Sequence, residues 1–120
     1  MTEEAPKPIG PYSQAIKVEN LVFVSGQGPV DPRTGQIVSG GIAEQTRQTF
    51  ENIRAILNAA GLTLEHVVKV SVFLKNIGDF SRMNEVYATL FKREPPARTT
   101  VQANLPLEGM LIEVDVVAAL

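Results

Sequence analysis

The two-residue alternation of side chains over residues 110–119 constrains the fold most strongly. Successive side chains of a strand point to opposite faces, so this stretch predicts a strand with two different faces. The first face is wholly apolar and consists of Met110, Ile112, Val114, Val116 and Ala118. The second face mixes apolar and acidic side chains: Leu111, Glu113, Asp115, Val117 and Ala119. The apolar face predicts that this strand packs against helices.

Residues 67–74 repeat this division. Alternation places Val68, Val70, Val72 and Leu74 on the apolar side, and Val67, Lys69, Ser71 and Phe73 on the other. The second face of such a sheet is too hydrophobic to be stable in water, and the chain has no third layer to cover it. Apolar faces of this kind mark interaction surfaces. We therefore expect a homo-oligomer in which sheets pack together.

The remaining patterns complete a β-β-α-β-α-β-β order. Strand patterns cover residues 15–18, 21–25 and 98–103. Helical spacing covers residues 42–60, with Gly61 as a C-cap, and Asp79 can cap a second helix. This order predicts an α+β fold in one domain over residues 1–120, with helices on one face of a sheet. The short loop 104–109 predicts an antiparallel pairing of the last two strands, which would bring Arg98 and Glu113 near the same subunit boundary.

Composition argues against several classes of site and partner. The 120 residues carry a formal net charge of −2, which argues against a nucleic-acid partner. There is no cysteine and one histidine, so disulfides and thiolate sites are excluded and a zinc site is not expected. Residues 1–6 do not resemble a secretory signal, and no apolar run reaches membrane-spanning length. We therefore expect a soluble, cytoplasmic protein without a membrane partner.

Arg98 is the first candidate for a site because it follows Pro95 and Pro96 at the start of a strand. Prolines restrict the backbone, so the chain enters this strand along a defined path and aims the guanidinium. An aimed guanidinium can bind a carboxylate through two parallel hydrogen bonds. The alternative is a surface arginine in an ordinary ion pair.

Further candidates each carry an alternative. Glu113 and Asp115 share one strand face, and they could act on a ligand or balance Arg98 and Lys69 structurally. Tyr12 could be a packing tyrosine, and Asn84 could be exposed on its helix. Gly26 would let the backbone approach a ligand closely, although the glycines around it do not form a dinucleotide fingerprint.

Several short segments together resemble the YjgF/RidA family of trimeric imine deaminases, nearly from end to end of the chain. The segments are Gly10-Pro11-Tyr12-Ser13-Gln14, Val24-Ser25-Gly26-Gln27, Asp31-Pro32-Arg33-Thr34-Gly35, Ala59-Ala60-Gly61-Leu62, Asn84-Glu85-Val86-Tyr87, Pro96-Ala97-Arg98-Thr99-Thr100-Val101 and Ile112-Glu113-Val114. The resemblance implies a chorismate-mutase-like fold with a mixed sheet. It also implies a homotrimer whose sheets enclose a central barrel, with sites between the subunits.

The resemblance further implies hydrolysis of 2-imino acids, such as 2-iminobutanoate and 2-iminopropanoate, to 2-oxo acids and ammonia. These imines are released by enzymes that use pyridoxal phosphate. Arg98 would bind the substrate carboxylate with the backbone of Gly26, and Glu113 would hold the attacking water. Tyr12 and Asn84 would line the cleft, and Thr100 would occupy a pocket position. No metal or cofactor is implied.

A second hypothesis is a trimer that binds a metabolite or a protein without catalysis, in a regulatory or chaperone-like role. The same fold supports different functions, so resemblance alone does not decide between the two. The combination of Tyr12, Asn84, Arg98 and Glu113 favours the enzyme, because a binding protein would not require all four.

Overall fold

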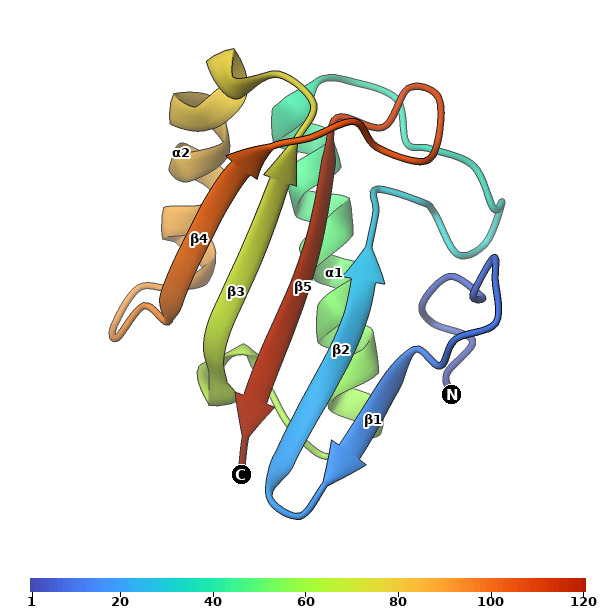
Figure 1. Ribbon diagram of the computed structural model, residues 1–120, viewed down its shortest axis with the longest axis vertical. Coiled ribbons are helices and arrows are strands. Elements are labelled where there is room, and N and C mark those ends of the chain that lie inside the picture. Colours follow the sequence, from blue (N-terminus) through green and yellow to red (C-terminus); the bar gives the residue numbers. More distant parts are fainter.

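The computed structural model describes residues 1–120 and has the expected element order (Figure 1). The strands are β1 (Ala15–Val18), β2 (Leu21–Gln27), β3 (Val67–Leu74), β4 (Ala97–Gln102) and β5 (Ile112–Ala119). The helices are α1 (Ile42–Ala59) and α2 (Phe80–Leu90), and the short 3₁₀ turns η1 (Leu64–His66) and η2 (Ile77–Asp79) precede β3 and α2. The predicted α+β fold is confirmed.

The five strands form one mixed sheet in the order β1-β2-β5-β3-β4. Strand β5 lies antiparallel to both β2 and β3, whereas β4 lies parallel to β3 at the sheet edge. The predicted antiparallel pairing of the last two strands is therefore wrong. Two parallel strands that are neighbours in a sheet are usually joined by a right-handed crossover. Here α2 connects β3 to β4, so β4 pairs with β3 at the sheet edge and not with β5.

Helix α1 begins and ends as its sequence predicts. Gly41 is the N-cap, and its N–H donates to Oε1 of Glu44 at 2.9 Å. At the other end, Gly61 has φ of +79°, a conformation that favours glycine. The N–H groups of Gly61 and Leu62 then donate to the carbonyls of Asn58 and Leu57, which is a Schellman motif.

Both helices cover the same face of the sheet (Figure 1), and the core lies between these two layers. The apolar side of β5 is buried as predicted, at Ile112, Val114, Val116 and Ala118. On the helical side, Phe50, Ile53 and Leu57 of α1 and Met83 of α2 are almost fully buried. Truncation of one such side chain to alanine costs about 2–5 kcal/mol.

One face assignment on β3 is wrong. Val68 is exposed and Val67 is buried, the reverse of the predicted alternation, whereas Val70, Val72 and Leu74 are buried as expected. The register between β3 and β5 shifts between Val67 and Lys69, as at a β-bulge. A bulge inserts one residue and reverses the alternation before it.

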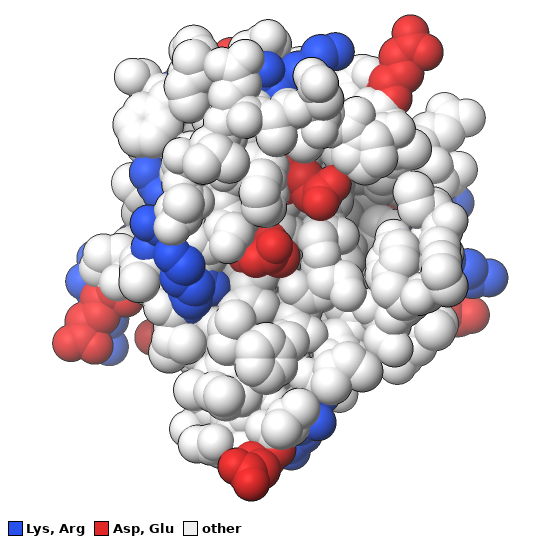
Figure 2. Space-filling model, in the orientation of Figure 1, with Lys and Arg blue, Asp and Glu red and all other residues white.

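The other face of the sheet, which we call the open face, is not covered by any element of the chain. Large apolar side chains are exposed on its strands, including Ile16, Val18, Phe23 and Val101. Figure 2 views this face and shows a largely uncharged surface with acidic groups near its middle. No helix of the structure is long and apolar enough to span a membrane.

Candidate functional site

A cleft of about 580 Å³ opens beside the end of β2. Its walls come from the N-terminal segment, the residues that follow β2 and the loop before β5, and they include Tyr12, Gly26, Met110 and Glu113. The contact between Gly26 and Glu113 is tight. A Cβ atom on Gly26 would lie 2.5 Å from Oε2 of Glu113, so only glycine leaves this carboxylate where it is.

Tyr12 lies at the mouth of this cleft. Its side chain is 46 % exposed, and its hydroxyl accepts the N–H of Ile9 at 3.3 Å. The phenol therefore braces the proline-rich N-terminal wall, and the residue lines the cleft.

Three buried amide side chains hold the walls of the cleft. Asn52 of α1 donates to the carbonyls of Gly28 and Val30, at 3.0 and 2.9 Å. Gln45 of the same helix donates to the carbonyl of Gly109 and accepts the N–H of Leu111. Gln14 bonds to the N-terminal segment, at Thr2 and Pro6. These residues satisfy backbone groups that the loops would otherwise leave unpaired.

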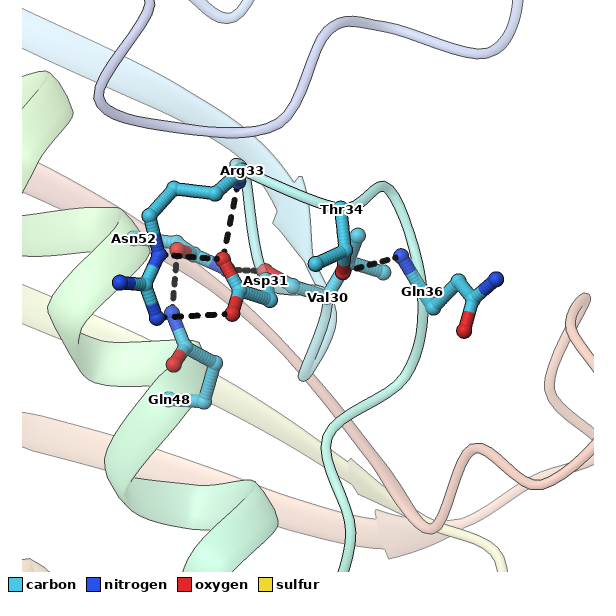
Figure 3. A network of polar contacts seen from close by, with 7 residues as sticks. All are labelled: Val30, Asp31, Arg33, Thr34, Gln36, Gln48 and Asn52. Carbon is cyan, nitrogen blue, oxygen red and sulfur yellow. Dashed lines mark hydrogen bonds and ion pairs between the residues drawn. The ribbon is translucent and has the colours of Figure 1, made fainter.

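The loop after Val30 is further fixed by its own turn (Figure 3). Asp31 accepts hydrogen bonds from Arg33, and their side chains form an ion pair at 3.1 Å. This hydrogen bonding lowers the pKa of Asp31. Nearby, Gln48 donates to Asn52 at 2.9 Å, which orients the amide that holds the loop.

The carboxyl group of Glu113 lies on the open face, next to Asp115 on the same side of β5. Burial raises the pKa of Glu113 above its ordinary value, and the negative charge of Asp115 raises it further. No ion pair joins Glu113 to a cation within the chain. A carboxyl group in this state binds and releases a proton closer to neutral pH than an ordinary glutamate does.

Arg98 lies elsewhere, on the face of β4 that meets α2. It is paired in register with Val70 of β3, which points into the core. Its Cζ lies 4.6 Å from the ring centre of Tyr87 and 5.5 Å from that of Phe80. The four ion pairs of the chain involve other arginines. The alternative of an ordinary intramolecular ion pair for Arg98 is therefore not what the structure has.

Unpartnered polar atoms are concentrated on the elements beside Arg98. Only four buried side-chain atoms lack a hydrogen-bond partner: Oγ1 of Thr49, Oδ1 of Asn84, the hydroxyl of Tyr87 and Oγ1 of Thr100. Asn84 and Tyr87 belong to α2, and Thr100 follows Arg98 on the same face of β4. A buried polar atom without a partner is costly and is typical of a binding site. We call Asn84, Tyr87, Arg98 and Thr100 the arginine cluster.

The predicted site residues thus form two groups within one chain. Tyr12, Gly26 and Glu113 line the cleft at the open face, whereas Asn84, Arg98 and Thr100 lie together on the helical side. The expectation that Arg98 and Glu113 lie on neighbouring strands is wrong, because β3 separates β4 from β5, and the two side chains leave opposite faces of the sheet.

Sequence reasoning missed the amides of Gln14, Gln45 and Asn52. The signal was present on α1, where polar residues at positions 45, 46, 49 and 52 fall on the buried side of the helix. Tyr87 was assigned only to the apolar stripe of α2, because its hydroxyl gives no periodic signal.

The sequence is similar to those of known proteins over nearly its whole length. It is 56 % identical over 117 residues to a RutC family protein of Pyrococcus horikoshii, and the match covers 98 % of this chain and 93 % of that protein. It is 45 % identical over 117 residues to the human 2-iminobutanoate/2-iminopropanoate deaminase, over 98 % and 85 % of the two chains.

Solved structures give the same relationship. The RidA structure from Psychrobacter sp. PAMC 21119 superposes with a TM-score of 0.95 at 40 % identity, over 100 % of this chain and 97 % of that one. Escherichia coli TdcF with bound serine superposes with a TM-score of 0.93 at 37 % identity, over 99 % and 94 %. A family model described as Endoribonuclease L-PSP matches residues 2–120. The chain therefore belongs to the YjgF/RidA family.

Proposed function

We propose that this protein hydrolyses 2-imino acids, such as 2-iminobutanoate and 2-iminopropanoate, to 2-oxo acids and ammonia. The observation that carries the proposal is an arginine without an ion pair, beside three buried polar atoms without partners. A carboxylate ligand would neutralise the guanidinium and accept hydrogen bonds from its fixed fork. The human relative named as an imine deaminase and the serine-bound TdcF structure support a ligand of the amino-acid class.

The reaction requires orientation more than strong activation, because a protonated imine is already a good electrophile. Arg98 holds the carboxylate with the backbone of Gly26, while Asn84, Thr100 and Tyr12 line the site and fix the C=N bond in place. Glu113 accepts a proton from water as its oxygen bonds to the imine carbon. The same proton then passes to the nitrogen of the tetrahedral adduct. As the C–N bond breaks and ammonia leaves, the adduct hydroxyl loses its proton to the Glu113 carboxylate and becomes the carbonyl of the 2-oxo acid.

This chemistry needs Arg98 and Glu113 in one site, although the chain places them on opposite faces of its sheet. We propose that a second copy supplies the missing half, in a homotrimer whose open faces enclose a central barrel. The exposed apolar side chains of β1, β2 and β4 support this assembly, since a monomer rarely exposes such a surface. The site would then lie between subunits, with the arginine cluster of one copy opposite the Glu113 cleft of the next.

The assay measures 2-oxobutanoate release from 2-iminobutanoate that is generated in the cuvette by an amino-acid oxidase. Semicarbazide traps the imine that has not reacted, so the enzymatic rate is read against spontaneous hydrolysis. We expect wild type to accelerate release and Arg98→Ala to reduce kcat/KM at least about 100-fold, the loss typical of a charged hydrogen-bonding group. Arg93→Ala is the matched control, because Arg93 is an exposed arginine that forms no ion pair.

Acceleration by wild type and Arg93→Ala, but not by Arg98→Ala, is the expected result. An active Arg98→Ala variant would contradict the role of the arginine. If no variant accelerated release, the protein would instead be a binding trimer without this catalysis.

A further inference from the structure

Tyr87 takes no part in the mechanism above, yet its ring is the nearest aromatic surface to the Arg98 guanidinium. Only 7 % of the residue is exposed. The ring is held from two sides, by Phe50 at 5.7 Å between ring centres and by Phe91 at 4.7 Å. A guanidinium stacked on a ring that cannot turn is itself fixed in direction.

The hydroxyl of Tyr87 is buried and has no hydrogen-bond partner. Burial raises the pKa of this phenol, and the adjacent Arg98 guanidinium, by its charge and its N–H groups, only partly opposes that effect. The group therefore stays protonated at neutral pH and has a proton to donate. A buried hydroxyl in this state costs stability unless a ligand accepts from it.

We propose that Tyr87 is a second ligand-binding residue of the arginine cluster, whose ring orients Arg98 and whose hydroxyl donates a hydrogen bond to the ligand carboxylate. The inference rests on the proposed function for the class of ligand. Arg98 supplies the charge, and Tyr87 supplies a neutral donor from the residue whose ring lies against the guanidinium. Two donors of different geometry select a planar carboxylate over an uncharged oxygen acceptor.

Tyr87→Phe tests this role because it removes one oxygen and keeps the ring under Arg98. Thr49→Val is the matched control, since Thr49 carries the one unpartnered buried hydroxyl that lies on α1 and outside the arginine cluster. The reaction product 2-oxobutanoate is titrated into each full-length protein, and its dissociation constant is measured by calorimetry. Thermal unfolding and turnover of 2-iminobutanoate are measured on the same samples.

We expect Tyr87→Phe to bind 2-oxobutanoate about tenfold more weakly than wild type, as for the loss of one hydrogen bond to a charged group. Its melting temperature should equal or exceed that of wild type, because no folded-state hydrogen bond is lost. Thr49→Val should bind as wild type does.

Equal affinity of Tyr87→Phe and wild type would overturn the proposal even if both variants turned the imine over. Failure of wild type to bind 2-oxobutanoate would overturn it as well. Weaker binding by Tyr87→Phe without any turnover by wild type would support Tyr87 and reject the deaminase. The two proposals therefore fail separately.

Discussion

At the scale of single residues, the contact between Gly26 and the Glu113 carboxylate gives the sharpest test of the cleft. A Cβ at position 26 would lie 2.5 Å from Oε2 and 3.1 Å from Cδ of Glu113, so Gly26→Ala must displace the carboxylate. The glutamate side chain is flexible and the backbone at Gly26 has no positive φ, so the fold should persist. We expect kcat/KM for 2-iminobutanoate to fall about 10- to 100-fold, as for a misplacement of about 1 Å.

Gly78→Ala is the control for this substitution. A Cβ at position 78 would meet no atom within 4 Å, and its backbone also lacks a positive φ. The control should retain wild-type turnover. Full activity of Gly26→Ala would show that the position of the Glu113 carboxylate does not matter to the reaction.

The proton affinity of Glu113 gives a second test at this scale. Within the chain its pKa is raised by burial and then by Asp115, and a profile of kcat/KM against pH should bend where this group titrates. Asp115→Asn removes one negative charge beside Glu113. Ionisation of Glu113 then becomes easier, and the bend should move to lower pH.

The sign of this shift separates the proposed role from a general loss of structure. A destabilised variant would lose activity at every pH, whereas a change in Glu113 alone moves the bend. A bend that stayed in place, or moved upward, would mean that Glu113 is not the group that titrates in the reaction.

At the scale of elements, α1 supplies both the core and the scaffold of the cleft. Asn52 uses both amide hydrogens on the carbonyls of Gly28 and Val30. Asn52→Ala leaves these two carbonyls without their partner, so the free energy of unfolding should fall by about 2–3 kcal/mol. Urea denaturation at one fixed protein concentration measures the change, because subunit association would make stability depend on concentration.

Asn58→Ala on the same helix is the comparison. The Asn58 side chain is exposed and forms none of these bonds, so the substitution should change stability by about 0.5 kcal/mol or less. Equal effects of the two substitutions would mean that the buried amide does not hold the loop.

The elements themselves were predictable where the sequence pattern was local. The two-residue alternation of β5 and the glycine at position 61 both indicated what the structure contains. Strand order was not predictable in this way, because pairing depends on contacts far apart in sequence. The short loop before β5 favoured a hairpin, yet the crossover through α2 makes β4 the partner of β3.

The candidate site, like the fold, was predictable from local sequence only in part. The residue types at Arg98, Asn84 and Glu113 singled them out as candidates in the sequence, but their distribution over two faces of the sheet could not be predicted. The bulge at Val67–Lys69 illustrates the reason, since one inserted residue reverses a face without changing composition. Buried amides such as Asn52 were missed because a polar residue on a helix is ordinarily assigned to solvent.

At the scale of the whole molecule, the open face and the divided site lead to the same expectation. The exposed apolar surface is typical of an interface, and the proposed reaction requires Glu113 of another copy beside the arginine cluster. A homotrimer meets both requirements if each subunit offers Arg98 to one neighbour and Glu113 to the other. Each closed interface would then complete one site.

Mixing two inactive variants tests this account most directly. Arg98→Ala and Glu113→Gln are unfolded together in equal amounts, refolded, and assayed for 2-oxobutanoate release from 2-iminobutanoate. Each variant alone lacks one half of every site. Among all randomly assembled trimers, including the inactive homotrimers, roughly one site in four combines an intact Arg98 with an intact Glu113 from the neighbouring copy. We predict that the mixture recovers about a quarter of wild-type activity, whereas a mixture as inactive as its two components would contradict a site shared between subunits.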